Sequence, residues 1–231
     1  MKAMLGLVFS SAAIMCFAQT APQAASIQPE VSFQFERIGL PVPRFTLVVH
    51  EDGTGTYKGE TAPVSGGASG AMLRPTSPGQ AIDRKVKLSA ATTELIFKTA
   101  RALDYFNIAC ASKAKNIADT GKKTLNYTGP DGHGSCLYNY SENKSVTQLT
   151  DMLQSIASTM DEGRKLDFMH RYDRLGLYSE MDSLNHEVQE KRALELQNIS
   201  QSLTSIANDE ALMERVREKA VKLLNQTGET K

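Results

Sequence analysis

The sequence predicts an α+β protein: an antiparallel sheet with two helices packed on one face, followed by an all-helical C-terminal extension. Two stretches of alternating apolar and polar residues flank glycine-containing turns, as β-hairpins do. Each is followed by a segment with apolar residues at helical spacing. All eight prolines lie at or before Pro130, and a helical pattern dominates the chain after residue 160. These three observations define the fold class. They divide the chain into an α+β domain, residues 31–160, and a helical extension, residues 161–231.

The first 18 residues have the features of a secretory signal peptide. Lys2 precedes an uncharged apolar run that ends at Phe17, and Ala18 supplies the small residue before a cleavage site. We therefore expect cleavage between Ala18 and Gln19. The run is shorter than the roughly 20 apolar residues that span a bilayer, and no second apolar run follows. The expected mature chain is periplasmic or secreted and has no transmembrane segment.

Signal removal also changes the cysteine count. Cys16 leaves with the signal peptide, and Cys110 and Cys136 stay in the mature chain. Thiols tend to pair in oxidising compartments outside the cytoplasm. The sequence therefore predicts a disulfide between Cys110 and Cys136.

The charge balance bears on the partner. The chain has 26 basic and 26 acidic residues, and loss of Lys2 leaves 25 against 26, a net charge of −1. A near-neutral chain lacks the field that attracts nucleic acid or an anionic membrane. We expect a protein or an envelope component as the partner, and no cofactor.

Residues 19–30, rich in Ala, Gln and Pro, are expected to form a disordered lead. The first hairpin is expected over residues 45–58, with its turn at Asp52-Gly53, because both residues tolerate a positive φ. Residues 64–80 contain a run of glycines and two prolines and predict a long loop. A further strand is expected over residues 82–88.

The two helices of the α+β part follow. Ser89 is expected to cap a helix that runs to about Tyr105. A second hairpin over residues 124–140 comes next, with its turn at residues 129–134. Ser145 and Gln148 then form the pattern of a capping box, which opens a helix ending near Met160.

The extension contains three apolar sets. Within the first two, the spacing alternates between three and four, as one face of a helix requires. The last helix is expected to begin after Asp209. The three sets are Leu177, Met181, Leu184 and Val188; Leu196, Ile199, Leu203 and Ile206; and Leu212, Val216, Ala220, Leu223 and Leu224.

Two resemblances add to this interpretation. Residues 45–160, with the D-G-T-x-x-Y turn that ends at Tyr57, resemble uncharacterised bacterial exported proteins with a hairpin-helix-hairpin-helix layout. That family implies no activity. Residues 199–224 resemble one HEAT-like helical hairpin. Because a solenoid needs at least three stacked units, we expect a docked hairpin rather than a repeat array.

One candidate binding surface stands out. Lys122 and Lys123 lie close in sequence to Tyr127, Tyr138 and Tyr140, and tyrosines with lysines can anchor a partner. Tyr138 and Tyr140 share a face if the strand is regular. The alternative is that these tyrosines are half-buried packing residues of the sheet.

The leading functional hypothesis is a non-enzymatic exported protein that acts as a binding or envelope-associated module. One rival is a hydrolase in which His50 or His133 meets an acid from a distant loop. No two histidines are three or four residues apart, so no helical metal face is predicted. A second rival is a small inhibitor or chaperone-like protein that uses an exposed sheet edge.

Overall fold

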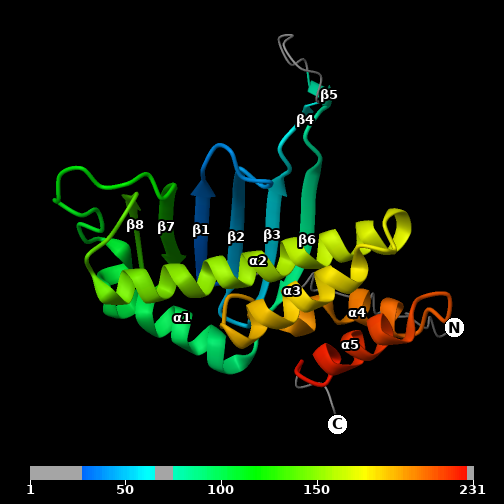
Figure 1. The fold of residues 1–231 in the computed structure, drawn as a ribbon. Coiled ribbons are helices and arrows are strands. Elements are labelled where there is room, and N and C mark those ends of the chain that lie inside the picture. Colours follow the sequence, from blue (N-terminus) through cyan, green and yellow to red (C-terminus); the bar gives the residue numbers. More distant parts are fainter. Residues whose placement is uncertain (1–27, 66–74, 228–231) are drawn as a thin grey trace, which may run out of the picture.

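The computed structural model describes residues 28–65 and 75–227 (Figure 1). A six-stranded antiparallel sheet has helices on one face, and an all-helical unit completes the chain. The predicted α+β class is therefore confirmed. The expected signal peptide and cleavage site, with Ala18 and Gln19, lie outside the described residues, as does most of the expected disordered lead.

The strand order of the sheet is β6-β3-β2-β1-β7-β8. Neighbouring strands are antiparallel throughout. The strands are β1 (Glu30–Glu36), β2 (Arg44–His50), β3 (Thr54–Glu60), β6 (Ala81–Lys87), β7 (Lys122–Gly129) and β8 (Gly132–Tyr138). In the expected loop of residues 64–80, β4 (Val64–Ser65) and β5 (Pro75–Ser77) form a separate two-stranded ribbon.

Strand β1 lies near the middle of the sheet, and the sequence-based prediction missed it. It pairs with β2 on one side and β7 on the other, and so joins the two predicted hairpins. Val31, Phe33 and Phe35 are buried and alternate with polar residues, which is the period of a half-buried strand. This alternating pattern was visible in the sequence, in residues that the prediction placed at the start of the α+β domain without assigning a strand.

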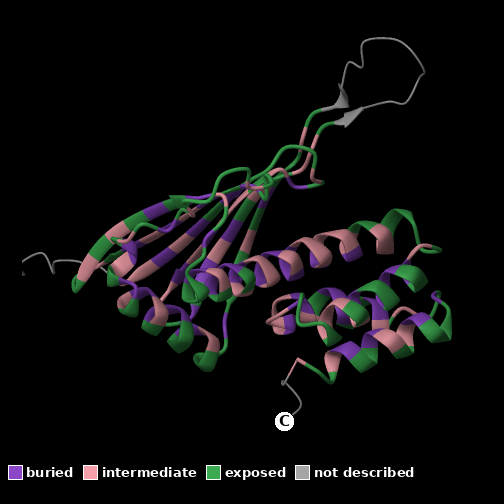
Figure 2. Cartoon of the chain, turned by 60° about the vertical axis from the view of Figure 1, so that its left-hand side comes forward, coloured by how far each residue is buried: buried purple, intermediate pink, exposed green. Residues whose placement is uncertain are grey.

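One face of the sheet forms the core, and buried residues alternate along the strands with more exposed ones (Figure 2). Successive side chains of a strand point to opposite faces, so the buried positions alternate along each strand. The core-facing residues include Val31, Phe33, Phe35, Leu47, Val49, Tyr57, Ile82, Val86, Leu125, Tyr127, Cys136 and Tyr138.

Helices α1 (Ala90–Ala102) and α2 (Lys144–Tyr172) cover the core face, as predicted (Figure 1). The Ser89 hydroxyl caps α1 by accepting from the Thr92 amide. The β2–β3 turn lies against this end of α1. Gly53 has a φ of +79°, and a Cβ there would lie 2.9 Å from the Leu88 carbonyl oxygen. The turn therefore requires glycine for both conformation and space.

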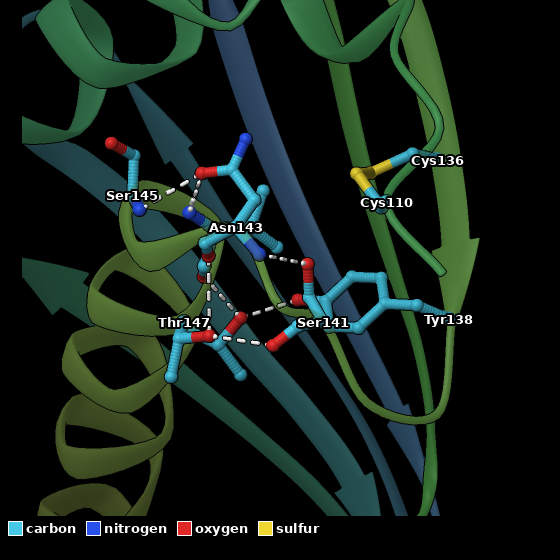
Figure 3. Close-up of a disulfide and its surroundings, with 9 residues drawn as sticks. Cys110, Cys136, Tyr138, Ser141, Asn143, Ser145 and Thr147 are labelled. Atoms are coloured by element: carbon cyan, nitrogen blue, oxygen red, sulfur yellow. Dashed lines mark hydrogen bonds between the residues drawn. A yellow bond between two sulfur atoms is a disulfide. The ribbon is translucent and has the colours of Figure 1, made fainter. Parts of the chain in front are cut away.

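Helix α2 differs from its prediction at both ends. It begins at Lys144, and the Asn143 side chain caps it by accepting from the amides of Ser145 and Val146 (Figure 3). The expected capping box at Ser145 is therefore wrong by two residues. The helix continues to Tyr172, so the expected boundary at residue 160 falls inside one continuous helix.

The molecule nevertheless has two hydrophobic clusters. The first lies between the sheet and helices α1 and α2 and includes Met160. The second begins on α2 at Leu166 and fills the space between the helices of the extension. The change in composition that suggested a boundary thus marks a change of core without a linker.

The extension consists of α3 (Leu177–Gln189), the 3-10 turn η2 (Leu196–Ile199), α4 (Ser200–Ala207) and α5 (Glu214–Leu224). Helices α4 and α5 form the expected docked hairpin. The expected cap at Asp209 is wrong, because α5 starts at Glu214 after Met213. Asp209 instead accepts from the Ala211 amide in the connecting turn.

Candidate functional site

A cleft of about 680 Å³ lies beside α1, and we call it the α1 cleft. This volume lies in the range of small-molecule sites. Its walls come from the β2–β3 turn, the end of β6 and one side of α1. The lining residues are Glu51, Asp52, Lys87, Leu88, Ala90, Thr93, Glu94, Phe97, Lys98 and Arg101.

Arg101 organises one end of this cleft. Its Nη1 lies 2.7 Å from Glu51 Oε1 in the β2–β3 turn, and its Nε donates to Asp131 Oδ2 at 2.7 Å in the β7–β8 turn. The guanidinium carbon also lies 5.8 Å from the centre of the Phe97 ring and 5.9 Å from that of Tyr127. One α1 side chain therefore fixes both hairpin turns against the helix.

The same network sets the charge states at this end. The Tyr127 hydroxyl donates to Asp131 Oδ1 at 2.6 Å. Burial and this hydrogen bond raise the pKa of Tyr127 to about 12. The hydrogen bonds from Tyr127 and Arg101 hold the pKa of Asp131 below its usual value. At neutral pH Tyr127 is therefore protonated and Asp131 is ionised. The pair supports the structure and does not relay protons.

The cleft also contains charged side chains without a fixed partner. Glu94 and Lys98 lie on α1, and within the described residues neither side chain has a charged group of opposite sign within 4.0 Å. Leu88 and Phe97, both buried, supply the apolar part of the same lining. This lining can hold a small ligand that has an apolar body and carries charges of both signs.

The predicted disulfide is supported by the geometry. The sulfur atoms of Cys110 and Cys136 are 2.02 Å apart, the length of a disulfide bond. Cys110 follows the 3-10 turn η1 (Asp104–Phe106) and Cys136 lies on β8 (Figure 3). The bond holds the segment after α1 against this outer strand.

The structure does not assemble the five residues of the predicted tyrosine and lysine surface. Tyr127, Tyr138 and Lys123 are on the core face of the sheet and are only 1%, 4% and 6% exposed. Tyr140 is 46% exposed, just beyond the end of β8. Lys122 is exposed on the opposite face beside Glu36. The tyrosines therefore follow the alternative, packing within the sheet, except for Tyr140.

Lys123 is buried because backbone oxygens surround its ammonium group. Its Nζ donates to the carbonyl oxygens of Thr120, Gly121 and Asn139 at 2.9, 3.1 and 2.8 Å. Burial lowers the pKa of Lys123. The strand period could have revealed this position, since Lys123, Leu125 and Tyr127 are two residues apart and share one face.

The rival enzyme hypothesis rests on two histidines. His50 Nδ1 lies 3.8 Å from Glu30 Oε2 on the neighbouring strand. His133 contributes its carbonyl oxygen to a hydrogen bond from Asn107. A third histidine, His170, contacts Asp209 at 2.8 Å. No serine, threonine or cysteine side chain of the described residues hydrogen-bonds to these rings, and none of the three lines the α1 cleft.

In residues 28–65 and 75–227, no three His, Cys, Asp or Glu side chains gather in a way that could hold a metal ion. None of the helices in the described part of the chain is both long and apolar enough to cross a bilayer.

A scan against protein-family models finds none that matches this chain, and a search of curated proteins finds no relative.

Proposed function

We propose that this chain is an exported binding protein that holds a small zwitterionic ligand in the α1 cleft. The observation that carries the proposal is the lining of the cleft, which combines Lys98 and Glu94, unpaired among the described residues, with the Arg101 network and with the apolar residues Leu88 and Phe97. A ligand with an ammonium group, a carboxylate and an apolar body would complement all three features.

Export is supported by the signal-like N-terminus and by the cysteine pair. Thiols that pair in a folded protein are typical of compartments outside the cytoplasm. To test export, the full chain is expressed in a bacterial host with a secretion pathway, and the N-terminus of the extracytoplasmic protein is determined. We expect Gln19. Retention of Met1 on exported protein would refute the cleavage site.

Binding is tested with the dipeptide Leu-Leu, which has both charges and an apolar body. Saturating dipeptide should raise the melting temperature of the mature protein, since a ligand at about 100 times its Kd stabilises the native state by about 2.7 kcal/mol. Lys98→Ala and Glu94→Ala should each reduce the shift. Lys113→Ala, an exposed lysine away from the cleft, is the matched control. An equal shift in all variants would exclude the cleft.

A further inference from the structure

The two outer strands of the sheet, β6 and β8, differ in what lies beside them. The β8 edge is flanked by the segment that the disulfide holds in place, and Asn107 donates to the His133 carbonyl there. The β6 edge lies beside a groove between the sheet and helices α2 and α4. An outer strand presents unpaired backbone groups to any extended chain that can reach them.

The orientation of the β6 backbone follows from its two ends. The Gln80 carbonyl accepts from the Thr61 amide, and the Leu88 amide donates to the Gly53 carbonyl. The backbone groups of the even-numbered β6 residues therefore point toward β3. In an antiparallel strand, the N–H and C=O groups of the residues between them then point away from that neighbouring strand. The backbone groups of Ala81, Asp83, Lys85 and Lys87 therefore point outward from the sheet.

Lys87 shows that this edge pairs readily with an amide. The Asn198 side chain accepts from the Lys87 amide at 2.7 Å and donates to the Lys87 carbonyl at 3.0 Å. This two-way contact imitates one residue of an added strand. Among the described residues, no group bonds the outward backbone of Ala81, Asp83 or Lys85, so three successive pairing positions are open.

The groove beside this edge has a volume of about 370 Å³ and a positive charge. Arg84 is neutralised by Asp167 at 2.5 Å, and Asp83 lies 3.8 Å from Lys58. Lys85 and Arg171 have no carboxylate within 4.0 Å in the part of the chain that the structure describes. The lining residues are Arg84, Lys85, Met160, Asp167, Arg171, Asn198, Gln201, Ser202 and Ser205.

We propose that the β6 edge binds an acidic peptide segment of a protein partner, which adds to the sheet as a seventh strand. Its backbone pairs with Ala81, Asp83 and Lys85. Neighbouring residues of an added strand point to opposite faces, so successive acidic side chains reach Lys85 on one face and Arg171 on the other. This inference uses a different surface from the α1 cleft and does not rest on it.

Charges on an outer strand also serve a simpler purpose, since they discourage the edges of two molecules from pairing. Under that explanation Lys85 and Asp83 repel extended chains of any kind. The two explanations differ in one respect: only a binding edge distinguishes an acidic peptide from a basic one of the same length and shape.

The test uses a short, fluorescently labelled peptide in which pairs of successive glutamates alternate with pairs of valines, so that acidic side chains lie on both faces of the added strand. Binding to the mature protein is followed by fluorescence anisotropy. We expect saturable binding, and none of the matched lysine-valine peptide. Lys85→Glu and Arg171→Glu should each weaken binding about tenfold or more. Lys122→Glu, at an exposed lysine on β7, is the control and should bind as the wild type does.

Backbone pairing is tested separately. Asp83→Pro removes an outward amide that β3 does not use, a change that outer strands tolerate. It should abolish binding, whereas Asp83→Ala, which keeps the amide, should not. Should the proline variant unfold, a peptide N-methylated at alternate residues replaces it, because this probe leaves the protein unchanged. Equal binding of the N-methylated peptide, or no binding of the acidic peptide, would overturn the proposal.

Discussion

The two hydrophobic cores share helix α2, but they differ in the polar groups and covalent bonds at their borders. The sheet core is apolar apart from such groups as Lys123, whose ammonium is surrounded by carbonyl oxygens, and a disulfide holds its outer strand. The helical core is bordered by the carboxyl groups of Glu162 and Glu180 with Lys165 between α2 and α3. We therefore expect reduction to destabilise the protein through the first core and a change of pH to act through the second.

Polar contacts also join the two cores. Glu195, which precedes η2, accepts from the Ser89 amide at 2.7 Å and contacts the Thr92 hydroxyl at the start of α1. In the middle of α2, a Cβ at Gly163 would lie 2.3 Å from Ile199 Cγ2. The extension thus packs closely on α2 and is hydrogen-bonded to the start of α1, so the two cores should unfold together.

The largest effects are expected from cavities in either core. Phe33→Ala should cost about 3–5 kcal/mol and Leu203→Ala about 2–5 kcal/mol, because both side chains are fully buried. Hydrogen exchange tests the coupling. If the cores unfold together, Leu203→Ala accelerates exchange of the slowest amides in β1 as well as in α4. Faster exchange confined to the extension would show that the cores are independent.

Removing the disulfide is expected to cost slightly less. Cys110 and Cys136 are 26 residues apart, and a loop of that length limits the unfolded chain by about 3.5 kcal/mol in the entropy model. The bond also holds the neighbouring turn Asp104–Phe106, in which three non-glycine residues have positive φ. Urea unfolding of Cys110→Ser/Cys136→Ser gives the value. Two reactive thiols in the unreduced, denatured wild type would contradict the bond.

These regions also show what the sequence could and could not predict. Three predictions agree with the structure: the turn at Asp52-Gly53, the Ser89 cap and the cysteine pairing. The first two depend on neighbours in sequence, and the third depends on the compartment. Strand β1 was missed although its alternation is clear, because it has no hairpin turn of its own to mark it.

The candidate site was harder to predict. Arg101 joins turns that are 50 and 30 residues away in sequence, and no local pattern reports such a contact. The predicted surface relied on residues close in sequence, but neighbouring strand residues point to opposite faces. Lys122 and Lys123 therefore lie on different sides of the sheet.

A smaller effect is expected at the contact between the two cores. Glu195→Gln should cost roughly 2 kcal/mol, since it removes charge-assisted hydrogen bonds that solvent partly screens. Partial burial raises the pKa of Glu195, but the hydrogen bonds from Thr92, Ser89 and Gln197 outweigh it and lower the pKa overall. This contribution is present above the unfolded-state pKa and is lost as the pH falls through the lowered folded-state value. Thermal unfolding from pH 6 to pH 3 should show a smaller decline in Glu195→Gln; equal declines would contradict the assignment.

The smallest effect, with the opposite sign, is expected at the border of the helical core. Burial and the hydrogen bond with Glu180 raise the pKa of Glu162 to about 8. A raised carboxyl pKa means that the folded state keeps a proton which the unfolded state releases, so stability falls as the pH rises from about 4.5 to about 8.

Glu162→Gln imitates the protonated carboxyl and should remove that decline, leaving the variant more stable than the wild type above pH 8 by roughly 1 kcal/mol after solvent screening. Asp182→Asn, a half-exposed carboxylate of α3 paired with Lys219, is the control and should keep the wild-type slope. The difference between the wild-type and Glu162→Gln urea midpoints, followed from pH 5 to pH 9, isolates Glu162 from the other groups of the chain. A constant difference would show that Glu162 does not keep its proton in the folded state. The two cores would then differ only in their response to reduction of the disulfide.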